Sequence, residues 1–177
     1  LKQLGAEFDA VLITVGAHGS KNVGMEGEET KPSGLISGVT FLRDLNLLYP
    51  SGKFTPPVGE TVAVIGGGNV ALDCARSARR LGYKKVIVIY RRTEKEMPAD
   101  NEEIRDAKHE GIEFHFLTHP IRLEIKDEKV AGLTCIRMEL GAPDSSGRRR
   151  PLEVKGSEFF MPCDIVIPAI GQATDLS

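Results

Sequence analysis

The sequence contains little that marks a secreted or metal-binding protein. It has three cysteines in 177 residues, Cys74, Cys135 and Cys163, and no two of them form a Cys-x-x-Cys pair. Closely spaced cysteine pairs are typical of zinc ribbons and redox dithiols, so we expect neither here. Widely spaced cysteines suit a reducing compartment, and we therefore expect a cytoplasmic protein without a metal site in this chain.

An excess of charge and a long hydrophobic run are also missing. Lys and Arg total 23 against 25 Asp and Glu, and the net charge of −2 gives no electrostatic reason to expect nucleic acid or an anionic membrane as a partner. Apolar runs such as residues 86–90 are far shorter than the ~20 residues that span a bilayer. No basic segment followed by an apolar one opens the chain, so no signal peptide is expected.

Apolar runs and helical patterns alternate along the middle of the chain. Residues 61–65 and 85–90 read as buried strands, and the helix between them carries one apolar stripe that ends before Gly82. We expect the series to continue with a helix over 101–109 and a strand over 113–117. Segments 121–126 and 130–139 are shorter and more alternating, which predicts an antiparallel meander with turns at 127–128 and 141–147. The pattern predicts an α/β fold: a Rossmann-like parallel sheet with an antiparallel β-meander.

Further signals precede this unit. Ser37 is a candidate cap and Pro50 a stop for a helix between them, and residues 51–59, with two prolines and two glycines, read as a linker. The chain opens at Leu1 rather than at a methionine and ends in a loop-like segment. We therefore expect a piece of a longer protein.

Residues 8–16 and 163–171 are similar apolar runs, and each is expected to form a buried parallel strand. Asp9 lies seven positions before Gly16, and Asp164 lies seven positions before Gly171. Two interpretations stay open: chance similarity between two buried strands, or two related dinucleotide-binding domains, the first represented only by its last strand.

The segment 62–92 carries the strongest chemical signal. Gly66, Gly68 and Ala71 supply G-x-G-x-x-A between a strand and a helix, which is the arrangement that lets a pyrophosphate approach the backbone at a helix N-terminus. The spacing alone is weak, but within a β-α-β unit of about thirty residues it favours dinucleotide binding over a glycine-rich turn that serves only packing.

The second strand ends in Arg91 and Arg92 rather than in the acid that usually accepts a hydrogen bond from the ribose 2′-hydroxyl of NAD. An acid would repel a 2′-phosphate, whereas a guanidinium can donate charge-assisted hydrogen bonds to it. The expected cofactor is therefore NADPH, and the alternative is a solvated basic loop.

Other basic groups are weaker candidates. Residues 148–150 are three arginines in a Gly/Pro/Ser-rich turn, for which a solvated turn is the favoured interpretation. The four histidines have no acid or cysteine at metal-ligand spacing. No G-x-S-x-G or H-E-x-x-H motif supports hydrolysis.

Several segments together resemble a known family, the NADPH-binding domain of the glutamate synthase small (beta) subunit. This family includes the flavoprotein subunit of the NADPH-dependent ferredoxin:NADP+ transhydrogenase and is related to flavin segments of dihydropyrimidine dehydrogenase. The resemblance covers nearly all of the chain, and the segments that carry it are VAVIGGGNVALDCARSARRLG, YRRTEKEMPA, EEIRDAKHEGIEF, IRMELGAPDSSGRRRP and AIGQATD.

The resemblance implies an NADPH domain inserted into an FAD domain. Residues 1–34 would then be the end of the first FAD-domain half, 35–56 a connecting helix and linker, 57–171 the NADPH-binding domain and 172–177 the return to the FAD domain. In such proteins NADPH reduces FAD, and electrons pass through iron-sulfur clusters to a partner subunit or fused domain.

The resemblance also implies roles for individual residues. The pyrophosphate would contact Gly67, Gly68, Asn69 and Val70, and the 2′-phosphate Arg91 and Arg92. Gly171 would lie near the nicotinamide and flavin, and Gly16 beside the FAD. The FAD glycine motif and the cluster cysteines are absent from this chain, so we expect no catalytic residue in it and no activity of the chain alone.

Two other functions compete with this interpretation. A nucleotide sensor would bind NADPH without redox chemistry, and only the enzyme demands an FAD motif before Leu1. A short-chain dehydrogenase needs a Tyr-x-x-x-Lys pair on a helix; Tyr49 and Lys53 have that spacing, but Pro50 and Gly52 between them prevent one helix from presenting both.

Overall fold

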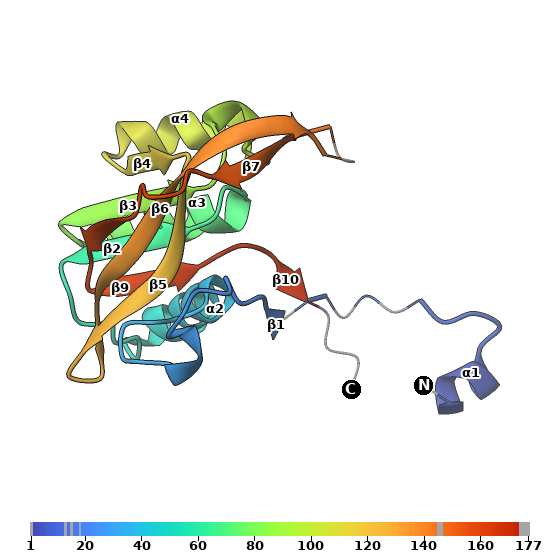
Figure 1. Cartoon of the computed structure of the whole chain (residues 1–177). Helices are drawn as coiled ribbons and strands as arrows, with labels where there is room; N and C mark the ends of the chain where they lie inside the picture. Colours follow the sequence, from blue (N-terminus) through green and yellow to red (C-terminus); the bar gives the residue numbers. More distant parts are fainter. Residues whose placement is uncertain (1, 13, 15, 18, 145–146, 174–177) are drawn as a thin grey trace.

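The computed structural model describes residues 2–12, 14, 16–17, 19–144 and 147–173. Its centre is a parallel sheet in the order β4-β3-β2-β9 (Figure 1). The strands of this sheet are β2 (Thr61–Ile65), β3 (Lys85–Tyr90), β4 (Glu113–Phe116) and β9 (Ile165–Pro168). Two predicted strands have these bounds and the third, 113–117, is one residue longer than β4. The predicted α/β fold is confirmed.

Side chains along each central strand alternate between the two faces of the sheet. Val62 and Val64 of β2 belong to the core beneath the helices, whereas Ala63 and Ile65 belong to the core beneath the antiparallel strands. Because both faces are covered, these strands are apolar at nearly every position, as parallel sheets require.

Helices cover one face of the sheet. They are α2 (Gly38–Leu48), α3 (Asn69–Arg80) and α4 (Asn101–His109). Ser37 caps α2 by accepting a hydrogen bond from the Thr40 N–H at 3.2 Å, as the sequence predicts. Asp100 caps α4 by accepting from the Glu102 N–H at 2.7 Å. Short 3-10 turns complete this layer: η2 (Tyr49–Ser51) and η3 (Glu94–Glu96).

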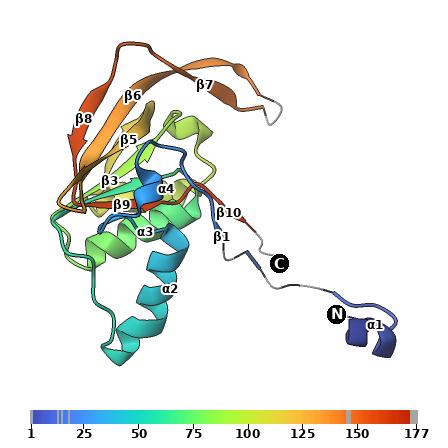
Figure 2. The ribbon, with the colours of Figure 1, turned by 60° about the horizontal axis from the view of Figure 1, so that its bottom comes forward.

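An antiparallel layer covers the other face, so that the sheet lies between it and α2 and α3 (Figure 2). Its strands are β5 (Thr118–Lys126), β6 (Lys129–Pro143), β7 (Arg149–Glu153) and β8 (Phe159–Pro162). Asp127 and Glu128 join β5 to β6 with φ angles of 50° and 60°, the left-handed pair of a tight hairpin. The meander is confirmed, although β6 is longer than expected and β8 was not predicted.

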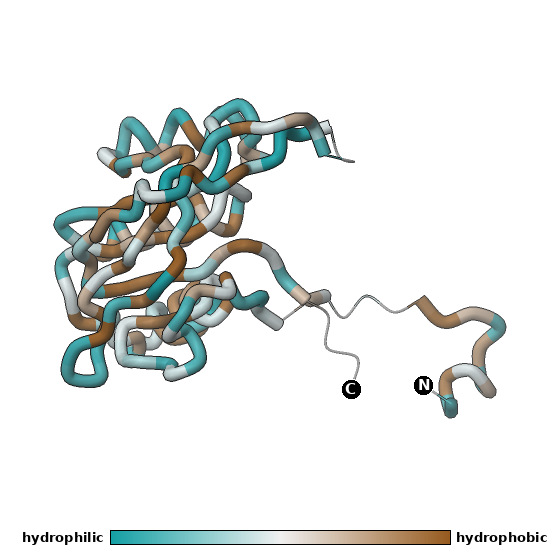
Figure 3. Tube along the Cα trace, in the orientation of Figure 1, coloured by the Kyte–Doolittle hydropathy of each residue, from teal (hydrophilic) through white to brown (hydrophobic). Residues whose placement is uncertain are grey.

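The first residues depart from the expectation. The described part of 8–16 contains no strand, and Phe8 and Leu12 are 59% and 88% exposed. Helix α1 (Lys2–Glu7) has no buried residue and lies apart from the rest in both views, and the tube after it shows apolar residues away from the core (Figure 3). The prediction of a buried strand is wrong for the described residues of 8–16, and residues 13 and 15 lie outside the described part. A buried parallel strand needs neighbouring strands on its edges, and the described residues supply none here.

The next segment packs on the antiparallel layer and includes η1 (Glu28–Thr30). Met25 is 3% exposed in the core, and the Glu26 N–H donates to the Ile121 carbonyl at 2.9 Å. β1 (Gly19–Ser20) pairs antiparallel with β10 (Gln172–Ala173). The stretches that follow Gly16 and Gly171 therefore run side by side. Within the part of the chain described, no helix is long and apolar enough to cross a membrane.

Candidate functional site

A pocket of about 570 Å³ lies at the carboxyl ends of β2, β3 and β9. This is the edge at which open α/β sheets bind ligands. It brings together most of the residues that the sequence singled out: Gly66, Gly67, Gly68, Asn69, Val70, Arg91, Arg92 and Gly171 all line it. Ala71 lies beneath it, fully buried in the first turn of α3.

Gly66 and Gly67 are required by the fold itself. Gly66 has a φ of 150°, and a Cβ there would lie 2.4 Å from the Ala169 carbonyl oxygen. A Cβ at Gly67 would lie 2.5 Å from the ring of Tyr90. Both contacts are closer than real side chains allow, so packing alone explains these two glycines.

Gly68 is different. Its φ of −97° and ψ of 175° are open to any residue, and a Cβ there would meet only the Pro98 Cγ, at 3.8 Å. Neither strain nor crowding within the chain calls for glycine at this position. Close approach of a ligand to the backbone does.

The N-terminus of α3 faces the same pocket with its donors uncovered by side chains. Gly68 is its N-cap, and no side chain among the described residues caps it. The Asn69 carboxamide oxygen instead accepts from the Asp100 N–H at 3.1 Å. The described residues that line the pocket include no acid. The helix dipole and the backbone amides at this uncapped end therefore favour an anion here.

The stretch after β3 supports the glycine loop from the other side. The Tyr90 hydroxyl donates to the Glu96 carbonyl at 2.7 Å, and the Ala99 N–H donates to the Gly67 carbonyl at 3.2 Å. Thr93 and Glu96 form a capping box on η3, and the Thr93 hydroxyl, which donates to the Glu96 carboxylate, holds the pKa of Glu96 below its ordinary value. The loop is thus held between α3 and η3.

The two arginines after β3 have different surroundings. Arg91 is exposed at the pocket. Arg92 is 5% exposed, and its Nη2 pairs with the Asp144 Oδ2 at 2.8 Å while its Nε donates to the Arg149 carbonyl at 2.7 Å. That both arginines contact a 2′-phosphate stays a prediction.

Residues of the antiparallel layer complete the pocket, and sequence reasoning missed them. They are Thr118, His119 and Pro120 of β5 and Arg148 before β7. Burial, and then the charge of Arg91, lower the pKa of His119 below its ordinary value, so the imidazole is neutral at pH 7. The three arginines of 148–150 are exposed, as a solvated turn predicts, and Arg148 also lines the pocket. No local motif marks these residues, because their place depends on how the meander packs.

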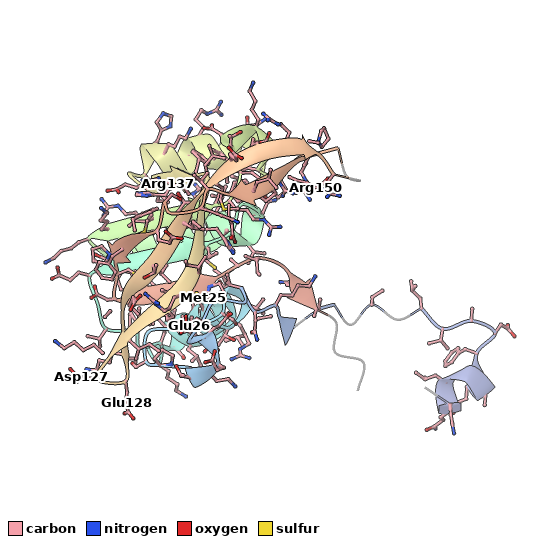
Figure 4. The ribbon with its side chains drawn as sticks, viewed as in Figure 1. Met25, Glu26, Asp127, Glu128, Arg137 and Arg150 are labelled. Carbon is pink, nitrogen blue, oxygen red and sulfur yellow. The ribbon has the colours of Figure 1, made fainter. Side chains whose placement is uncertain are left out.

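The hairpin of β6 and β7 carries Arg150, and Figure 4 shows it at the end of the molecule opposite the Asp127–Glu128 turn. Arg150 is exposed and does not line the pocket. Gly16 also lies outside the pocket, so its expected place beside a second cofactor is not tested by this site.

Neither metal chemistry nor thiol chemistry is built into the described residues. They contain no group of three His, Cys, Asp or Glu side chains that could hold a metal ion. The three cysteines are buried and unpaired, and burial raises the pKa of each thiol to about 12.

The parallel sheet, the glycine loop and the helix that follows it define a Rossmann-type domain. Comparison with known proteins names its family: the chain belongs to the pyridine nucleotide-disulphide oxidoreductases, whose family model matches residues 2–176. The chain is 54% identical over 178 residues to the NADP(+)-dependent formate dehydrogenase subunit beta of Moorella thermoacetica. The matched region is all of this chain and 24% of that relative.

Other relatives agree. The chain is 38% identical over 178 residues to the glutamate synthase [NADPH] small chain of Escherichia coli (strain K12), covering 97% of this chain and 37% of the relative. The resemblance to that family is confirmed. Among solved structures, Mycobacterium tuberculosis FprA in complex with NADPH matches with a TM-score of 0.75 and 22% identity, over 97% of this chain and 51% of that one, which supports the fold. The chain therefore spans only 24% and 37% of the length of these two curated relatives.

Proposed function

We propose that this chain is the NADPH-binding, electron-input domain of a flavoprotein oxidoreductase related to the glutamate synthase small chain. The observation that carries the proposal is Gly68: a glycine that the fold does not need, at the uncapped N-terminus of α3, in a pocket with arginines and no acid among its described lining. A dinucleotide phosphate explains all three features.

Different residues of the pocket would bind successive parts of the NADPH molecule. The pyrophosphate would accept hydrogen bonds from the backbone of Gly67, Gly68, Asn69 and Val70. The arginines beyond β3 would hold the 2′-phosphate, and Gly171 would lie toward the nicotinamide. Bound there, NADPH supplies a hydride equivalent, and this chain's residues bind and orient it. Hydride transfer between two bound cofactors depends on their placement rather than on acid or base groups, so the proposal assigns no proton-transfer role to this chain.

The complete protein would also bind FAD and pass electrons through iron-sulfur clusters to a partner subunit or fused domain. In this proposal residues 1–34 and 172–177 belong with the FAD domain, 35–56 connect, and 57–171 form the NADPH-binding domain. The pairing of β1 with β10 supports a common path for the chain as it leaves and re-enters that domain. The buried Met25 indicates that the last part of 1–34 packs on the NADPH-binding domain.

Calorimetric titration of the chain with NADPH and with NADH tests the proposal. NADPH is expected to bind more tightly, and Arg91→Ala is expected to cost roughly ten- to a hundredfold in NADPH affinity with little change for NADH. Arg43→Ala is the matched control, because Arg43 is an exposed arginine on α2 outside the pocket. Equal affinity for the two nucleotides in the parent chain would contradict the proposal.

The alternative function is a sensor that binds NADPH without redox chemistry. The same pocket serves both functions, so the discriminating material is the complete protein. If it contains a flavin that NADPH bleaches, the electron-input role holds. A complete protein that binds NADPH but carries no flavin would favour the sensor.

A further inference from the structure

One wall of the pocket comes from a part of the chain that precedes the parallel sheet. Among the described residues that line the pocket, Val23 alone comes from before β2. Its side chain is partly buried and also packs against the core beneath the antiparallel strands. Val23 therefore lies between that core and the space in which a ligand would bind.

The pairing of β1 with β10 leads Val23 to the end of β9. The Lys21 N–H, directly after β1, donates to the Gly171 carbonyl at 3.4 Å and so continues the antiparallel register of the two strands. Two residues further on, Val23 corresponds in this register to Ala169, which directly follows β9. Both Val23 and Ala169 line the pocket.

Residues 21–26 form a crossing segment that runs from this end of the parallel sheet to the antiparallel layer. The Glu26 N–H donates to the Ile121 carbonyl at 2.9 Å, and the Leu123 N–H donates to the Glu26 carbonyl at 2.8 Å. The segment thereby pairs with the edge of β5, where Figure 4 shows Met25 and Glu26. Met25 is 3% exposed and anchors the segment in the core. The crossing segment is thus fixed at both ends.

The carboxylate of Glu28 holds the middle of the crossing segment. Its Oε1 accepts from the Val23 N–H at 2.9 Å, and its Oε2 accepts from the Gly24 N–H at 2.8 Å. Both hydrogen bonds are charge-assisted. They need the two oxygens of a carboxylate, because an amide offers one acceptor oxygen and its NH2 group would face an N–H. Glu28 begins η1, so a short helical turn fixes the position of Val23 at the pocket.

The wall that contains Val23 is apolar. Val23, Ala169 and Ile170 line this part of the pocket, whereas Arg91 lines it after β3. The reduced nicotinamide is an uncharged planar ring, and the phosphates of the dinucleotide are anionic. Apolar side chains suit the ring, and guanidinium groups suit the phosphates.

We propose that Val23 forms the wall against which the nicotinamide end of NADPH rests, and that Glu28 is a positioning residue that holds this wall in place. The inference rests on the proposed function. A wall that is fixed before the ligand arrives needs no ordering on binding, so its loss weakens the complex. Residues of 1–34 thereby take part in NADPH binding in addition to their connection with the FAD domain.

Calorimetric titration of the full chain with NADPH and with adenosine 2′,5′-bisphosphate tests the role of Glu28. The bisphosphate has the adenosine and the 2′-phosphate of NADPH but no nicotinamide. Glu28→Gln is expected to weaken NADPH roughly three- to tenfold and the bisphosphate by less than about twofold. Glu29→Gln is the matched control, because Glu29 is an exposed glutamate on the same η1 turn. Equal effects on the two ligands, or equal effects of the two variants, would overturn the positioning role.

Variants of Val23 test the wall itself with the same two ligands. A tryptophan would occupy the space beside the end of β9, so Val23→Trp is expected to weaken NADPH by more than about tenfold and the bisphosphate by less than about twofold. If Glu28 acts through Val23, Glu28→Gln changes NADPH affinity by less than about twofold in the Val23→Ala background. A full effect of Glu28→Gln in that background would refute the positioning role.

Folding is checked by circular dichroism. Should Val23→Trp or Glu28→Gln fail to fold, Val23→Ala decides, with an expected loss of about threefold for NADPH and none for the bisphosphate. Equal effects of Val23→Ala on the two ligands would then overturn the inference.

The failure of this inference differs from the failure of the proposed function. A parent chain that binds neither NADPH nor the bisphosphate refutes both. A parent chain that binds both ligands, with a ratio of affinities that Val23→Trp and Glu28→Gln leave unchanged, refutes only the roles of Val23 and Glu28.

Discussion

Replacing Gly68 by valine separates ligand binding from folding. The backbone at Gly68 is extended, with a φ of −97°, and the nearest atom to an added Cβ is 3.8 Å away. A side chain at an N-cap costs about 1 kcal/mol relative to glycine, whereas the loss of chain entropy in the unfolded state stabilises by ~0.5–1 kcal/mol. These effects offset each other, so the free energy of unfolding is expected to change by less than about 1 kcal/mol.

The same side chain would stand where the pyrophosphate approaches the backbone. If two charge-assisted hydrogen bonds are lost, at ~1.5–3 kcal/mol each, NADPH affinity falls by about 10²- to 10⁴-fold. Calorimetry gives the affinity and thermal unfolding by circular dichroism gives the stability, where Tm should stay within about 4 °C of the parent.

Gly66→Ala is the matched comparison. Its φ of 150° and the 2.4 Å approach to the Ala169 carbonyl predict a loss of about 3 kcal/mol and a fall of roughly 6–12 °C in Tm. A folded Gly68→Val protein that binds NADPH as tightly as the parent would refute the reasoning, because the phosphate would then lie elsewhere.

Three further predictions concern the rest of the fold. Gly34→Ala should lower the free energy of unfolding in urea by about 3 kcal/mol, because the new Cβ would lie 2.4 Å from the Asp164 carbonyl oxygen at a φ of 96°. Gly52→Ala is the control: its φ is 68° with open space around it, so it should cost only about 1 kcal/mol. Similar losses in the two variants would argue against the close packing at Gly34. The pKa of His119 is lowered below 6.5 in the folded chain, so the unfolded chain binds its proton more tightly and stability falls as the pH drops through 6.5 toward the folded pKa. His119→Gln should lose less stability than the parent between pH 7 and pH 5, and parallel losses would contradict it. The pKa values of the three buried cysteine thiols are raised to about 12, so in the folded chain all three should resist a disulfide reagent at pH 8. In denaturant all three should react. Rapid reaction of any thiol in the folded chain would contradict its burial.

Much of the parallel sheet could be predicted because its signals are local. The strands over 61–65 and 85–90 are continuous apolar runs bounded by polar or glycine residues, and the helix over 101–109 has a capping acid before it. The same reasoning failed for 8–16, an equally apolar run, because burial of a parallel strand depends on neighbouring strands rather than on its own residues. β8 escaped prediction since four residues are too few to show a period, and Phe160 points a hydrophobic ring toward solvent at 58% exposure.

The candidate site also contains residues that a local sequence pattern predicts and residues that it does not. The glycine loop and the two arginines are contiguous with β2 and β3, so a sequence pattern could find them. Thr118, His119 and Arg148 reach the pocket only because the meander folds back over the sheet. The burial of Arg92 depends on Asp144, which is 52 positions away. Such pairings are long-range, and no local spacing encodes them.

The central claim is that the anion of a dinucleotide binds the amides at the N-terminus of α3. An NMR titration of the isotope-labelled chain with NADPH tests it most directly, since amide shifts report binding residue by residue. The largest changes are expected on the amides of Gly67, Gly68, Asn69 and Val70, and these changes should be nearly absent in Gly68→Val. Saturable changes confined to other surfaces, with these four amides unmoved, would contradict it.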